Sequence, residues 1–108
     1  PGFVISLLPE LLEIIRHSDS VIMRDYAIDA VAGMASTGPD EAGLALPVLR
    51  ESLTVWEGRH AGHALAGIRN AAENLPDLAD ELRTTAEGLK THSNSSVQKL
   101  ARQILKAM

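Results

Sequence analysis

Apolar residues recur at intervals of three or four positions along almost the whole chain, which is the spacing of one face of an α-helix. The first of these stripes runs from Phe3 to Ile15 and contains Pro9, so its helix is expected to begin near Leu8 or to bend there. No segment alternates apolar and polar residues as a half-buried strand would. Five further helices are expected at about residues 21–36, 40–55, 59–73, 77–90 and 96–107.

Short polar segments separate these stripes and carry the residue types that begin and end helices. Ser18, Asp19 or Ser20 can cap the second helix by accepting a hydrogen bond from a free backbone amide of its first turn. Residues 37–40 end that helix with Thr-Gly-Pro-Asp, where glycine suits a helix end and proline suits the first turn of the next helix.

The fourth predicted helix is unusually rich in small residues, which include Gly62 and Gly67. Each glycine inside a helix costs about 1 kcal/mol relative to alanine. Such residues are retained where a neighbouring backbone or side chain must come very close. We therefore expect this helix to be the central and most enclosed one.

A repeated segment indicates how the helices are arranged. Asp25–Met34 reads DYAIDAVAGM, and 34 residues later Arg59–Ile68 reads RHAGHALAGI. A repeat of this length is typical of stacked helical hairpins, and we expect three of them, at about residues 1–38, 39–74 and 75–108. A closed six-helix bundle is the structural alternative. The helix expected at residues 21–36 should face inward with the side that contains Met23, Ala27, Ala30, Val31 and Met34.

A common pattern of aliphatic and small residues links the second and fourth helices: Met23, Arg24, Ala27, Ala30 and Val31, then Ala61, Ala64 and Leu65. This pattern resembles the second helix of HEAT repeats, with armadillo repeats as the second resemblance. The resemblance extends over nearly the whole chain. It implies an all-α fold, a right-handed α–α superhelix of about three stacked hairpins. The acid–arginine ladder between repeats of that family is matched only by Asp19 and Arg24 in the first hairpin.

Composition limits the classes of function. The 108 residues suffice for one small domain, and 45% of them are hydrophobic but only 3% are aromatic, so an aliphatic core is expected. The absence of cysteine excludes disulfides, thiol catalysis and cysteine-bound zinc. No apolar run is long enough to cross a membrane and no signal peptide is visible, so we expect a cytoplasmic protein without membrane contact.

Charge is unevenly distributed along the chain. Residues 1–82 contain five basic and thirteen acidic residues, a balance of -8, whereas residues 83–108 contain five basic residues and one acidic residue, a balance of +4. The net charge of -4 argues against a general nucleic-acid binder. The basic end is either an ordinary solvated helix, which we favour, or a site for nucleic acid or an acidic partner. The residues of that alternative site are Lys90, Lys99, Arg102 and Lys106.

Residues suited to catalysis or metal binding do not form a recognisable site in the sequence. His60 and His63 lie three positions apart on one helix, but zinc requires a third or fourth ligand and the nearest acid is Glu57. The serines at residues 93–96 lie in a polar turn, without the strand-turn-helix context of a catalytic nucleophile. We therefore expect no enzyme activity, no cofactor and no metal site.

The second helices of the three hairpins are expected to form the binding surface. At about 100° per residue, Asp25, Asp29 and Ala32 point away from the inward face of the first of these helices. The residues at the same positions of the other two second helices would lie beside these, in rows that cross the three helices. The charge along these rows changes from acidic to basic. Ordinary solvated polar side chains, without any partner, would give the same pattern. The predicted partner-binding residues are Asp25, Asp29, Arg59, His63, Lys99, Gln103 and Lys106.

The sequence therefore predicts a non-catalytic scaffold that binds a protein partner through this surface. Two alternatives remain open: binding of nucleic acid or an acidic partner through the basic C-terminal helix, and a helical regulatory subunit or domain of an enzyme. A homo-oligomer and membership of a longer solenoid also fit a three-repeat stack without polar end caps.

Overall fold

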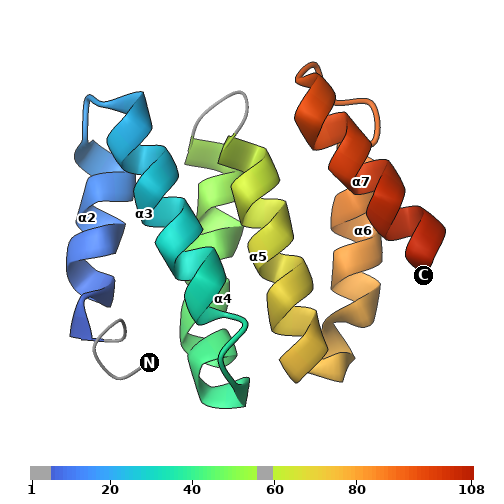
Figure 1. The fold of residues 1–108 in the computed structure, drawn as a ribbon, viewed down its shortest axis with the longest axis horizontal. Helices are drawn as coiled ribbons and strands as arrows, with labels where there is room; N and C mark the ends of the chain where they lie inside the picture. Colours follow the sequence, from blue (N-terminus) through green and yellow to red (C-terminus); the bar gives the residue numbers. More distant parts are fainter. Residues whose placement is uncertain (1–5, 56–59) are drawn as a thin grey trace.

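The computed structural model describes residues 6–55 and 60–108, with the side chains of residues 54 and 55 left aside. Six α-helices and one 3-10 turn lie in these residues, and no strand occurs among them (Figure 1). The α-helices are α2 (Leu8–His17), α3 (Val21–Met34), α4 (Pro39–Val55), α5 (His60–Asn74), α6 (Ala79–Leu89) and α7 (Ser95–Ala107), and the 3-10 turn η1 (Pro76–Leu78) precedes α6.

The helices pair into three hairpins that stack one beside the next. α2 packs on α3, α4 packs on α5, and α6 packs on α7. The second helices of the hairpins lie side by side in Figure 1, where α3 and α7 each pack on α5. Neither α2 nor α3 packs extensively on α6 or α7 within the described residues. The all-α fold of stacked hairpins that the repeat predicts is therefore confirmed.

The stack is two helix layers deep. Its principal extents are 35 × 31 × 15 Å. Packed helices lie about 8–10 Å apart and each backbone adds a radius of about 2.3 Å, so the shortest extent matches two layers. One layer contains α2, α4 and α6, and the other contains α3, α5 and α7 (Figure 1). The second helices thus share one broad face of the molecule.

Helix boundaries follow the breaks that the sequence predicts. α2 begins at Leu8 with Pro9 in its first turn, where proline is tolerated because the missing N–H would have no partner inside the helix. Ser20 caps α3, and its side-chain oxygen accepts a hydrogen bond from the Met23 amide at 3.2 Å. Asn94 caps α7 in the same way. Of the three capping residues that the sequence offers before α3, Ser20 is the one that caps this helix.

The core is aliphatic, and α5 lies at its centre, in contact with α3, α4, α6 and α7. Gly67 of α5 is buried where a side chain would not fit. A Cβ there would lie 2.6 Å from Leu49 Cδ2 and 3.0 Å from Ala32 Cβ. The central, closely approached helix predicted from its glycines is therefore confirmed at Gly67. The largest fully buried side chains are Ile15, Ile28, Val31, Leu49, Ser52, Leu65, Ile68 and Val97.

The inward face of α3 differs from the predicted one. Met23 and Ala30, predicted inward, are exposed, whereas Asp25 and Ala32, predicted outward, are buried. The buried positions of α3 coincide with those of α5 when the two helices are aligned 33 residues apart, whereas the sequence repeat is 34 residues long. A shift of one residue rotates the inward face of a helix by about 100°. Alanine is common in both helices, so the sequence match does not distinguish the two registers. The buried pairs are Ile28 and Ala61, Val31 and Ala64, Ala32 and Leu65, and Ala35 and Ile68.

Two asparagines attach α5 to the end of α3. Asn70 Nδ2 donates to the carbonyl oxygen of Ala32 at 3.0 Å, and Asn74 Nδ2 donates to that of Ala35 at 3.1 Å. Carbonyl groups at the end of a helix have no partner within the helix, so these bonds satisfy acceptors that would otherwise need water. They also hold the first two hairpins in one register.

Ion pairs connect the first helices of successive hairpins. Arg16 of α2 donates to both carboxylate oxygens of Glu51 in α4, at 2.8 and 2.7 Å. Arg50 of α4 donates to both carboxylate oxygens of Glu81 in α6. Hydrogen bonds from the guanidinium groups, together with their charge, lower the pKa of each carboxyl group more than partial desolvation raises it.

Glu51→Gln combined with Glu81→Gln is expected to make stability less sensitive to acid. Because the folded pKa values of both groups lie below the ordinary value of 4.5, their contribution is present above about pH 4.5 and is lost as the pH falls through the folded values. The urea midpoint should therefore fall less between about pH 6 and pH 3 in this variant than in the wild type. Glu10→Gln with Glu73→Gln removes the same charge from exposed glutamates and should keep the wild-type pH dependence. Parallel profiles for all three proteins would contradict the prediction.

Candidate binding face of the second helices

A shallow pocket lies between α3 and α5 on the face formed by the second helices. This hollow, the α3–α5 pocket, has a volume of about 350 Å³. Two of the lining residues from α3 are adjacent, and the other two lie three and four positions before and after them, so all four share one face of that helix. The pocket therefore belongs to two successive hairpins. It is lined by Ile22, Asp25, Tyr26 and Asp29 from α3 and by His63 from α5.

Large apolar side chains are exposed along the first half of α3. Four of the six exposed large hydrophobic residues in the described part of the chain lie there, namely Val21, Ile22, Met23 and Tyr26. Two of them line the pocket: Ile22 is 58% exposed and Tyr26 is 68% exposed. Contiguous exposed apolar side chains commonly mark an interaction site. Ile22 and Tyr26 are absent from the set predicted from the sequence, although their four-residue spacing shows that they share a face.

A contact between Asp29 and His63 joins the two walls of the pocket. Asp29 Oδ1 lies 3.6 Å from His63 Nδ1, and the two form an ion pair only when the imidazole is protonated. Both side chains remain open to solvent, since 68% of the aspartate side chain and 40% of the histidine side chain are exposed. The Asp29 carboxylate is therefore accessible to a ligand that enters the pocket.

A second hollow lies on the other side of His63, between α5 and α7. Its volume is about 390 Å³. Gly62 and Ala66 of α5 form part of its lining, and their small size leaves room between the helices. Ser96 and Leu100 of α7 line the opposite side. Because His63 lines both hollows, they adjoin at this side chain.

The structure brings together three of the seven predicted partner-binding residues. Asp25, Asp29 and His63 line the α3–α5 pocket. The sequence predicts that Asp25 is exposed, but the rotation of α3 leaves it only 8% exposed. Arg59 lies outside the described residues. The remaining three are exposed on α7 and line neither hollow: Lys99, Gln103 and Lys106.

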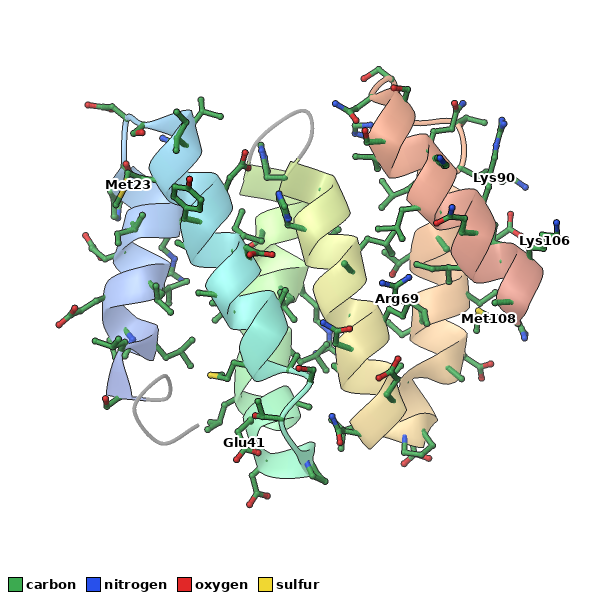
Figure 2. The ribbon with its side chains drawn as sticks, viewed as in Figure 1. Met23, Glu41, Arg69, Lys90, Lys106 and Met108 are labelled. Carbon is green, nitrogen blue, oxygen red and sulfur yellow. The ribbon has the colours of Figure 1, made fainter. Side chains whose placement is uncertain are left out.

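Basic residues of the C-terminal hairpin form a separate edge. Figure 2 shows Lys90 and Lys106 at the opposite side of the molecule from Met23 of α3. Lys90 Nζ lies 2.6 Å from a carboxylate oxygen of Glu87, so the charge of this lysine is paired with an acidic side chain of α6. The basic edge is therefore a different surface from the α3–α5 pocket.

The two neighbouring histidines of α5 differ in their surroundings. His60 is buried, with 2% of its surface exposed, whereas His63 faces the two hollows. Among residues 6–55 and 60–108, no group of three or more histidine, cysteine, aspartate or glutamate side chains is placed to hold a metal ion. In the same residues, no helix combines the length and the apolar character that crossing a bilayer requires.

Comparison with known proteins identified no relative of this chain. No protein-family model matches it, no curated protein is similar to it, and no solved structure matches its fold. Its function must therefore be inferred from its own geometry and chemistry.

Proposed function

We propose that this chain is a HEAT-like module that binds a protein partner, without catalysis, through the face formed by α3, α5 and α7. The observation that carries the proposal is the α3–α5 pocket, whose rim exposes Ile22 and Tyr26 beside the carboxylate of Asp29. Exposed aromatic and aliphatic side chains beside a few polar groups are the usual composition of a protein-binding hot spot.

The walls of the pocket are held in place before a partner arrives. α3 and α5 pack on one another, and both pack on α4 behind them. The bonds from Asn70 and Asn74 and the close approach at Gly67 fix α5 relative to α3. A surface that is ordered in advance loses little conformational entropy on binding, which favours affinity.

The stack of hairpins supports the HEAT-like assignment. Successive hairpins present their second helices on one face, and each hairpin contacts the next one along the chain. This arrangement, together with the repeated alanine-rich pattern, is what a helical solenoid requires. Solenoids commonly bind partners along the surface that their repeated helices share.

The proposal is tested by affinity capture from a native lysate with a paired set of surface variants. Ile22→Ser with Tyr26→Ser should reduce capture of a stoichiometric protein at least about tenfold, because hot-spot side chains dominate binding energy. Leu44→Ser is the control, since Leu44 is 47% exposed and belongs to α4 in the other layer. Nuclease treatment should leave the captured protein in place.

Three results would contradict the proposal. The first is capture that Ile22→Ser with Tyr26→Ser leaves unchanged, and the second is a loss that Leu44→Ser causes equally. The third is capture that nuclease abolishes, which would point to the basic edge formed by the C-terminal hairpin, because binding through phosphates depends on its lysines and arginines.

A further inference from the structure

We infer that the α3–α5 pocket receives an arginine side chain, flanked by apolar residues, from the protein partner. This inference rests on the proposed function and specifies the chemistry that the pocket recognises. It follows from the charge of the pocket, from the exposed aromatic ring beside that charge, and from the apolar side chain at its edge.

The charge of the pocket favours a cation. Two of its five lining residues, Asp25 and Asp29, are aspartates, and the side chain of Asp29 is 68% exposed. His63 carries a positive charge only when it is protonated. Arg24 and Asp25 are both buried, so the charge that a ligand meets in the pocket is that of Asp29. The pocket also lies in the part of the chain, residues 1–82, that carries thirteen acidic and five basic residues.

The position of Tyr26 favours a guanidinium over an ammonium group. Tyr26 is 68% exposed and lines the pocket, one helical turn from both Ile22 and Asp29. A guanidinium is planar, so it can stack on an aromatic ring while its N–H groups donate to a neighbouring carboxylate. Ile22 offers apolar surface to the methylene stem of the same side chain.

The same chemistry disfavours acidic ligands at this pocket. A phosphate or a partner carboxylate would face the Asp29 carboxylate, and like charges in contact reduce affinity. An apolar residue beside the arginine would meet the exposed side chain of Ile22, which lines the pocket. The expected occupant is therefore a short basic and apolar protein segment.

The experiment is an NMR titration of the intact chain with two peptides of five residues. One has arginine between two leucines, and the other has citrulline in place of arginine, which keeps the shape but removes the charge. The arginine peptide should shift the amide signals of Ile22, Tyr26, Asp29 and His63 and bind about five- to tenfold more tightly than the citrulline peptide. Signals of α6 should not move.

Two isosteric variants test whether the Asp29 carboxylate is the group that binds the arginine side chain. Asp29→Asn should weaken binding of the arginine peptide about three- to tenfold and leave the citrulline peptide unaffected. Asp80→Asn is the matched control, because Asp80 is an exposed aspartate of α6 in the other helix layer, and it should leave both affinities unchanged.

The inference is overturned by equal binding of the two peptides, by equal losses in Asp29→Asn and Asp80→Asn, or by no binding of either peptide. Its failure differs from failure of the proposed function. A partner whose capture depends on Ile22 and Tyr26 would still support a protein-binding face when the arginine peptide shows no preference. Capture independent of those residues would instead remove the proposed function itself.

Discussion

Leu65→Ala is expected to lower the free energy of unfolding by about 2–5 kcal/mol, because it deletes a side chain at the centre of the core and leaves a cavity. Leu65 is fully buried on α5, the helix that contacts α3, α4, α6 and α7. A domain of this size has a total stability of about 5–15 kcal/mol, so the loss is a large fraction of the whole.

The matched control is Leu44→Ala, which makes the same chemical change at an exposed site. Leu44 is 47% exposed on α4, so its truncation should change stability by less than about 0.5 kcal/mol. Urea unfolding followed by circular dichroism measures both values, and the denaturant dependence should stay the same in each variant. Similar losses at the two positions would show that α5 is not the centre of the core.

Gly67→Ala is expected to destabilise the chain by about 1–2 kcal/mol, although alanine is the better helix former by about 1 kcal/mol. The added Cβ would lie 2.6 and 2.9 Å from the two terminal methyl groups of Leu49 and 3.0 Å from Ala32 Cβ. Leu49 is fully buried and Ala32 cannot rotate away, so neither neighbour can move without disturbing the core. Gly43→Ala is the control: apart from the adjoining residues and backbone of its own helix, nothing lies within 4 Å of the new Cβ, and this variant should gain about 0.5–1 kcal/mol.

A double-mutant cycle isolates the contact at Gly67. Leu49→Ala removes the two methyl groups that the new Cβ would meet, so Gly67→Ala should cost less in that background than in the wild type. The interaction energy should reach at least about 1 kcal/mol, as is usual for residues in direct contact. Strict additivity, or a gain of stability on Gly67→Ala alone, would contradict the close approach of α3, α4 and α5.

Local features of the sequence were sufficient to predict the helices and their order. The three- and four-residue spacing of apolar positions, Pro9, and the capping residue Ser20 act within one or two turns of chain, so they can be recognised without a structure. Gly67 also indicated that α5 would be closely surrounded, because a helix rarely keeps an interior glycine without a packing reason. The repeat then predicted that the hairpins would stack.

The candidate site was predicted only in part. The repeat predicts that Asp29 and His63 share one surface, and the structure places both at one pocket. The sequence does not identify Ile22 and Tyr26 as surface residues, because apolar residues at helical spacing usually belong to the core. Only the packing of neighbouring helices shows which apolar residues remain uncovered.

By itself, the sequence determined the helices of this protein, their breaks, its aliphatic core and its hairpin stack. The tertiary structure decided how far each helix is rotated about its axis. A shift of one residue between two alanine-rich helices turns a face by about 100° with little change in the sequence match. That rotation buries Asp25 and Ala32, exposes Met23 and Ala30, and brings Ile22, Tyr26 and Asp29 together against His63. Helical periodicity fixes the angles between residues of one helix, but only contacts with other helices choose which side faces inward.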